Sequence, residues 1–265
     1  MQDWLVTALL GVVEGVTEFV PVSSTGHLLI VEHALGAKRS DLFNVVIQSG
    51  AVLAVLPVFK SRLGWICTNW RDGQTRDYVL KLAVAFVLTC IGGAALELAG
   101  VELPERLWPV AIAMFAGGVA FLLVELWLRT RRLEDKITWP VALGVAAGQL
   151  LAAACPGVSR SGASILACLI LGTARPAATE FSFIVGVPTM LAAGALKIFS
   201  ALTRAEVGAT VEPWPTILLG FGIAAVVSFV AVKWLVRYVQ THTFAVFGWY
   251  RIAAAIVLVL VGAGR

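Results

Sequence analysis

The chain has 265 residues, of which 59% are hydrophobic and 14% are charged, and its mean hydropathy is +0.90. Soluble domains carry far more charge than this, so the composition excludes an ordinary water-soluble fold. The placement of Lys and Arg says more than the formal net charge of +4, and nothing in the sequence indicates nucleic-acid binding. Apolar runs of about 20 residues, the length that crosses a bilayer, recur along the chain. The sequence therefore predicts a single membrane domain over residues 1–265.

In chain order, two kinds of apolar segment are expected. Segments 4–34 and 140–173 are long but are interrupted by VPVSSTGH and CPGVSRSG, whose Pro, Gly and Ser residues break a helix. Irregular backbone at membrane depth must be buried in protein or line a wet cavity, so each segment is predicted to be a re-entrant helix-turn-helix hairpin. About six full transmembrane helices are predicted at residues 42–59, 78–98, 108–128, 180–199, 214–235 and 244–263. The expected fold is thus an all-α integral membrane protein.

The basic residues support this topology. If both broken segments return to the side from which they came, Lys and Arg collect at one end of the bundle. That end has Lys60, Arg62, Arg71, Arg76, Arg129, Arg131, Arg132, Lys136, Arg175, Lys233 and Arg237, and the other has Lys38, Arg39, Arg106, Arg204 and Arg265. An excess of basic residues marks cytoplasmic loops, so the first set is predicted to be cytoplasmic and both termini external.

The two halves of the chain also resemble each other. The matching residues are Gly11, Gly15, 23–26, Phe43 and Lys60 in the first half, and Gly144, Gly148, 159–162, Phe181 and Lys197 in the second. Three spans separate the broken segments, so they enter from opposite faces. The sequence predicts an inverted-topology repeat, with copies at about residues 1–100 and 140–238, whose broken helices meet near the midplane.

The first broken segment carries two acids. Glu14 and Glu18 are four residues apart, so both carboxylates project from one face of a helix. Carboxylates at membrane depth need a cavity, a partner or a cation, which makes this pair a functional hypothesis. The run Ser23-Ser24-Thr25-Gly26-His27 follows at once. If a helix starts there, its free N–H groups favour a phosphate, although Ser and Thr are also ordinary helix caps.

The second broken segment carries an arginine with apolar sequence on both sides. Its turn reads Pro156-Gly157-Val158-Ser159-Arg160-Ser161-Gly162. The planar guanidinium of Arg160 suits a phosphate, and a buried salt bridge to Glu14 or Glu18 is the alternative, with which phosphate binding can coexist. Together the two turns offer the groups of a phosphoryl-transfer site.

At these residues the chain resembles the bacitracin-resistance type of undecaprenyl-diphosphate phosphatase. The matching motifs are Glu14-x-x-x-Glu18, Pro21-Val-Ser-Ser-Thr-Gly-His27 and Pro156-Gly-x-Ser-Arg-Ser-Gly162. The family usually has Thr at the position of Ser164, and a glutamine often found ahead of the last motif is displaced by about one position to Gln149, which is left out of the predicted site.

The resemblance implies an enzyme that hydrolyses undecaprenyl diphosphate to the monophosphate and inorganic phosphate, recycling the carrier lipid of cell-wall synthesis and conferring bacitracin resistance. It implies a divalent cation, Mg²⁺ or Ca²⁺, and a bacterial inner-membrane protein whose site opens to the periplasmic face. The expected partners are the polyprenyl diphosphate and the bilayer, and a homodimer is left open. The implied site has catalytic Glu14, Glu18, Ser24, His27 and Arg160, phosphate-binding Ser23, Thr25, Gly26, Ser159, Ser161 and Ser164, and Glu14 and Glu18 as metal ligands.

Three questions stay open at this point. The nucleophile could be Ser24, which is favoured, or His27, or water, with Glu18 as the expected base. A secondary transporter of an anionic solute or lipid, driven by ions or protons, would also use inverted repeats and acids at the midplane. Arg251, within the last predicted span, is expected to have a structural role rather than to bind phosphate.

Overall fold

The structure is a computed structural model that describes residues 2–100, 107–203 and 212–263. Within these residues the chain forms eleven α-helices and no β-strand. The helices are α1 (Asp3–Thr17), α2 (Ser24–Leu35), α3 (Asp41–Leu53), α4 (Lys60–Thr68), α5 (Gly73–Leu98), α6 (Leu107–Leu128), α7 (Trp139–Ala154), α8 (Arg160–Ile170), α9 (Arg175–Thr203), α10 (Trp214–Tyr238) and α11 (Ala245–Ala263). The predicted all-α fold is confirmed.

Five helices, α5, α6, α9, α10 and α11, are long and apolar enough to cross a membrane. They correspond to the predicted spans from 78–98 onward, so this multi-pass architecture is also confirmed. Many of their large apolar side chains face outward, as those of lipid-facing helices do; Val226 and Leu196 are two of them, at 68% and 66% exposure.

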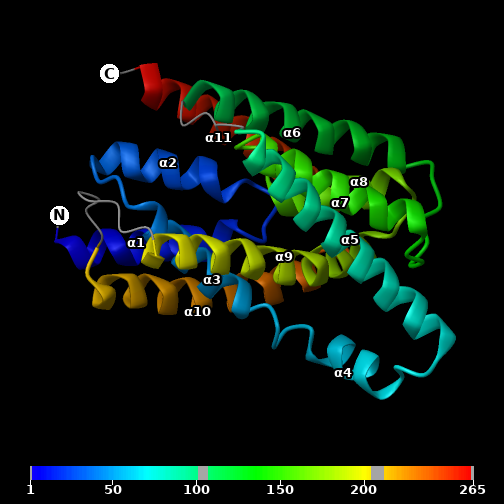
Figure 1. Cartoon of the computed structure of the whole chain (residues 1–265). Helices are drawn as coiled ribbons and strands as arrows, with labels where there is room; N and C mark the ends of the chain where they lie inside the picture. The colour runs from blue at the N-terminus through cyan, green and yellow to red at the C-terminus, as the bar shows by residue number, and fades with distance from the viewer. Residues whose placement is uncertain (1, 101–106, 204–211, 264–265) are drawn as a thin grey trace.

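The predicted span at 42–59 is wrong as a continuous helix. Helix α3 has 13 residues and ends at Leu53, and the chain then makes tight i→i+3 turns, such as Val58 N to Val55 O at 3.0 Å. Pro57 explains the break, because proline lacks an N–H and its ring clashes with the carbonyl four residues earlier, here that of Leu53. Helical structure resumes at Lys60 in α4, which projects from one end of the bundle (Figure 1).

Both broken segments form helix-turn-helix hairpins. Helix α1 packs against α2 and α7 packs against α8, with residues 18–23 and 155–159 between the helices. Figure 1 shows the first hairpin in blue beside the N-terminus and the second in green toward the opposite end of the bundle. The two hairpins therefore enter from opposite ends, as predicted.

In an inverted repeat, each helix of one half makes the contacts that its counterpart makes in the other half, and the helix packing has this pattern. Helix α1 packs on α10 as α7 packs on α5; α3 packs on α10 as α9 packs on α5; and α2 contacts α11 as α8 contacts α6. The two central pairs, α3 with α9 and α6 with α11, join the halves. The repeat bounds of 1–100 and 140–238 stay a prediction.

The end of the bundle beside α4 is rich in basic residues. There, Arg175 at the start of α9 donates to Glu125 on α6, and the same carboxylate accepts from the backbone N–H of Phe244 at 2.8 Å. Arg62 on α4 pairs with Glu180 on α9 at 2.5 Å. Lys38 and Arg39 lie at the other end, in the α2–α3 loop beside the N-terminus (Figure 1). Arg106, Arg204 and Arg265 lie outside the described residues.

Candidate active site

The first turn is a strained helix start. Helix α1 ends at Thr17, and α2 begins at Ser24 after an N-cap at Ser23. Ser23 has φ of 76°, a left-handed value that is uncommon for a residue other than glycine, and its hydroxyl accepts from the N–H of Gly26 at 3.5 Å. The cap thus uses the N–H of Gly26.

The second turn repeats this conformation. Ser159 has φ of 71°, and its hydroxyl accepts from the N–H of Gly162 at 3.2 Å. Among the described residues other than glycine, only Ser23 and Ser159 have positive φ. Such strain costs on the order of 1–3 kcal/mol per residue and concentrates at functional sites. The shared geometry makes the two serines equivalent positions of the two hairpins.

Arg251 on α11 joins the two turns. Its side chain is fully buried, and its guanidinium donates to Pro21 O at 3.2 Å and to Gly157 O and Val158 O at 3.0 Å each. It also donates to two carbonyls of α6. The predicted structural role of Arg251 fits these contacts, all of which are with backbone.

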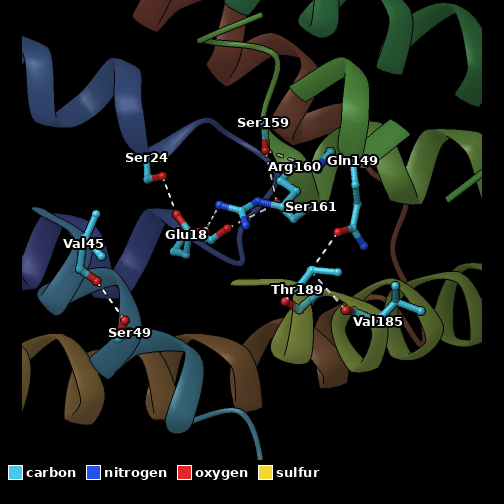
Figure 2. Close-up of polar contacts among 12 residues, drawn as sticks. Glu18, Ser24, Val45, Ser49, Gln149, Ser159, Arg160, Ser161, Val185 and Thr189 are labelled. Atoms are coloured by element: carbon cyan, nitrogen blue, oxygen red, sulfur yellow. Dashed lines mark hydrogen bonds and ion pairs between the residues drawn. The ribbon is translucent and has the colours of Figure 1, made fainter. Parts of the chain in front are cut away.

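Glu18, Ser24 and Arg160 form the centre of the site (Figure 2). The Ser24 hydroxyl donates to Glu18 Oε2 at 2.5 Å, and Arg160 Nη2 lies 3.6 Å from Glu18 Oε1. The Glu18 side chain is 5% exposed and that of Arg160 is 29% exposed. A hydroxyl bonded to a carboxylate is the arrangement of an activated nucleophile and its base, and the guanidinium keeps open surface for an anion.

A polar cavity opens over this centre. It has an empty volume of about 380 Å³. Its walls are formed by Glu18, Ser23, Ser24, Thr25, Gln48, Ala152, Pro156, Gly157, Ser159 and Arg160. We call this the headgroup cavity. Both hairpin turns contribute to it, so the structure brings five predicted residues of the hydroxyl and guanidinium set, together with Glu18, into one concave site.

A second cavity shares Glu18 and Arg160 with the headgroup cavity and has an empty volume of about 260 Å³. Its wall includes both of these residues together with Ser161, Ser164 and Gln149. Gln149 Oε1 accepts from the Thr189 hydroxyl at 2.8 Å, as Figure 2 shows, whereas Gln149 Nε2 and the Ser164 hydroxyl are buried without a hydrogen-bond partner in the described chain. Gln149 therefore borders the site, although the motif spacing had placed it outside.

Ser159 lines the headgroup cavity and Ser161 lines the second cavity, and together they connect the two turns. The Ser161 hydroxyl lies 3.3 Å from the backbone carbonyl of Glu18, to which it donates, and 3.1 Å from the Ser159 hydroxyl. This contact ties the start of α8 to the end of α1.

His27 and Gly26 lie apart from the headgroup cavity. His27 Nδ1 is 2.7 Å from Ser23 O, and because a carbonyl only accepts, Nδ1 donates; Nε2 then accepts from the Tyr250 hydroxyl at 2.8 Å. Gly26 packs on α6, where an added Cβ would lie 2.2 Å from Met114 Sδ. Their geometry suits support of the first turn better than contact with a substrate. Neither the Tyr250 contact nor Gln48 could be predicted, because both come from distant helices without a motif.

Glu14 is the second acid of the predicted metal pair. It is 1% exposed, no N–H group of the described chain donates to its carboxylate oxygens, and its side chain lies within hydrogen-bonding reach of the Glu18 carboxylate. Its charged neighbours are Glu18 and Arg160. The described residues contain no group of three His, Cys, Asp or Glu side chains that could hold a metal alone. Two carboxylates still fit Mg²⁺, which commonly binds one or two of them together with substrate phosphate oxygens.

Comparisons with known proteins agree with this site. The family model described as bacitracin resistance protein BacA matches residues 7–257. Proteins named undecaprenyl-diphosphatase from Rhizobium etli and Xylella fastidiosa are each 45% identical over 259 residues, covering 97% of this chain and 96% and 98% of theirs. One from Xanthomonas oryzae is 43% identical over 261 residues, covering 98% of this chain and 97% of its own. The chain therefore belongs to the bacitracin resistance protein BacA family.

Proposed function

We propose that the chain is a membrane phosphatase that hydrolyses undecaprenyl diphosphate to undecaprenyl phosphate and inorganic phosphate. The observation that carries this proposal is the 2.5 Å contact between the Ser24 hydroxyl and Glu18, made inside a polar cavity beside Arg160. The names of the relatives support the choice of substrate. Release of the monophosphate would recycle the carrier lipid and confer resistance to bacitracin.

In the proposed mechanism Arg160 and the hydroxyls of both turns hold the diphosphate. Ser24 Oγ attacks the terminal phosphorus and passes its proton to Glu18, while the bond to the bridging oxygen breaks and undecaprenyl phosphate leaves. Glu18 gives that proton to the departing undecaprenyl phosphate and is a base again. Water then attacks the phosphoserine, and Glu18 takes a proton from the water and returns it to Ser24 Oγ as the P–Oγ bond breaks. Attack by His27 is disfavoured, because both of its ring nitrogens are engaged away from the cavity.

We further propose that Glu14 and Glu18 hold a divalent cation, Mg²⁺ or Ca²⁺, in company with the phosphate oxygens. The unpartnered oxygens of Glu14 support this assignment, since a buried carboxylate without donors is costly unless a cation or another partner compensates it. A bound cation would supply neutralisation of the charge on the diphosphate.

We place the protein in the bacterial inner membrane, with the end that carries α4 in the cytoplasm and the site reached from the outer face. The excess of basic residues near α4 supports this orientation. The polyprenyl tail would stay between helices in the bilayer while the charged head enters the headgroup cavity.

The direct test is phosphate release from undecaprenyl diphosphate by detergent-purified protein, with added Mg²⁺ or Ca²⁺ or with a chelator. We expect turnover to require the cation. In Ser24→Ala we expect turnover to fall by about 10²-fold or more, the lower end of the 10²–10⁴-fold contribution typical of proton-transfer catalysis. A detergent solution holds no ion gradient, so turnover there excludes an obligatory coupled transporter. A folded but inactive wild-type protein would contradict the proposal and favour the transporter.

A further inference from the structure

Helix α3 contributes one polar side chain to the headgroup cavity from outside both hairpins. Gln48 is half-buried and lines the cavity together with Ser24, Ser159 and Arg160. No hydrogen bond within the described chain engages its amide. An amide that faces a polar cavity without a protein partner has both of its donors available to a ligand.

The rest of α3 is committed to packing. Val45, Ile47 and Ala51 are buried. Ser49 directly follows Gln48, and its hydroxyl donates to Val45 O at 2.9 Å (Figure 2). Gly50 packs closely against α10, where an added Cβ would lie 2.5 Å from Phe221 O. Packing thus accounts for the neighbours of Gln48, whereas Gln48 itself lines the headgroup cavity.

The two halves of the chain differ at this position. Counting from the matched residues Phe43 and Phe181, the counterpart of Gln48 is Gly186 on α9, which lines the second cavity. At this position of the repeat the first half therefore supplies an amide, to the cavity that Ser24 and Thr25 also line, whereas the second half supplies no side chain.

We propose that Gln48 is a substrate-binding residue whose amide N–H₂ donates to non-bridging oxygens of the lipid diphosphate, opposite the guanidinium of Arg160. This inference rests on the proposed function for its substrate. Gln48 would hold the head between α3 and the two turns, so that the diphosphate is bound from three elements rather than two. A neutral donor binds the anion without adding charge beside Glu18.

The test uses full-length protein in detergent, with farnesyl diphosphate as a soluble probe, and compares wild type with Gln48→Leu, Gln48→Glu and the control Ser49→Ala. Loss of a hydrogen bond to a charged group weakens binding on the order of 10-fold or more. We expect Gln48→Leu to raise KM by about that factor with a smaller change in kcat. Gln48→Glu should be worse than Gln48→Leu, because it replaces a donor by a negative charge, and Ser49→Ala should match wild type.

Calorimetric binding of the same probe separates the two proposals. Wild-type binding that is weakened in Gln48→Leu supports the role of Gln48 even if no phosphate is released, in which case only the phosphatase assignment fails. Unchanged binding and KM in Gln48→Leu would overturn the inference, as would a Gln48→Glu variant that binds better than Gln48→Leu. A wild-type protein that does not bind the diphosphate would overturn it as well. Thermal denaturation of each variant confirms that it is folded.

Discussion

Arg251 shows how one buried side chain can hold two distant turns. Its guanidinium bonds to carbonyls of both hairpin turns and of α6, and its five N–H donors suit this better than any other side chain could. A Cβ added at Gly117 on α6 would lie 2.2 Å from Arg251 Nη2, so α6 packs closely against the guanidinium. The distance between the two turns, and hence between Ser24 and Arg160, depends on this residue.

Replacing Arg251 should weaken both the fold and turnover. Arg251→Met leaves several buried carbonyls without donors, at about 1–3 kcal/mol each, and Arg251→Lys keeps the charge but has a compact head that cannot serve both turns. We expect a lower melting temperature in detergent for both variants, with Arg251→Met the lower, and a loss of phosphate release in both. A stable Arg251→Met variant that keeps a wild-type KM would instead show that the guanidinium is dispensable.

His27 is the residue whose position changes its expected role. The sequence motif groups it with Ser24, yet its ring stacks parallel to that of Tyr250 with centroids 5.5 Å apart, outside the headgroup cavity. Its proton on Nδ1 supports the carbonyl of the strained residue Ser23. We therefore propose that His27 acts on the chemistry through the backbone of the turn.

A double-mutant cycle tests this positioning role. His27→Asn retains an N–H donor for Ser23 O, so we expect it to keep turnover within about 10-fold of wild type, a loss near one hydrogen bond, while His27→Ala loses more. Tyr250→Phe should slow wild type but change nothing in His27→Asn. If His27→Asn were as inactive as Ser24→Ala, the imidazole would have to act on the substrate directly.

At the scale of elements, small residues let the first hairpin helix approach α10. An added Cβ at Gly11 would lie 2.9 Å from Gly220 O, and one at Gly15 would lie 2.7 Å from Ala224 O. Close backbone approach at small residues is the usual way that membrane helices associate. Because Gly15 lies between the two acids, this contact also sets the depth of Glu14 and Glu18.

We expect Gly15→Ala to destabilise the protein by about 1–3 kcal/mol, as overpacking does, and to lower phosphate release with it. Gly222→Ala on α10 is the matched control, because an added Cβ there meets nothing within 4 Å. The melting temperatures of the two variants in detergent provide the comparison. Equal stability of both would mean that the α1–α10 contact can shift without cost.

The elements also show what could be predicted from the sequence. The hairpins follow from Pro and Gly in two apolar runs, and long apolar helices follow from hydropathy alone, because both are local properties. The end of α3 at Leu53 follows from Pro57, a local signal that the hydropathy of residues 42–59 does not contain. Motif spacing could not place Gln149 in the site, because its position beside Ser164 depends on how α7 packs against α8 and α9.

At the scale of the whole molecule, two hairpins from opposite ends meet to form one site. Ser161 donates to the backbone of Glu18, and Arg251 holds both turns, so residues 143 positions apart lie in contact. An inverted repeat predicts this meeting, because it brings the two broken helices from opposite faces to the midplane. The two halves differ at the site: Ser24 of the first half corresponds to Arg160 of the second, and Gln48 corresponds to Gly186.

Accessibility of single cysteines tests the proposed orientation. The residues to compare are Asp41, exposed at the end near the N-terminus, and Thr130, exposed at the end near α4, in a variant whose four native cysteines are replaced by alanine. We expect a membrane-impermeant maleimide to label Asp41→Cys but not Thr130→Cys in spheroplasts, and both after lysis. The reverse pattern would invert the orientation.

The most direct test of the account is phosphate release by Glu18→Gln, Arg160→Ala and the double variant, measured with undecaprenyl diphosphate in detergent with Mg²⁺ or Ca²⁺. Glu18 belongs to the first hairpin and Arg160 to the second, 3.6 Å away. We predict that each single variant loses turnover and that the double variant is little worse than the more damaging one, because interacting residues are non-additive. Near-normal turnover in either single variant would contradict a single site built from both hairpins.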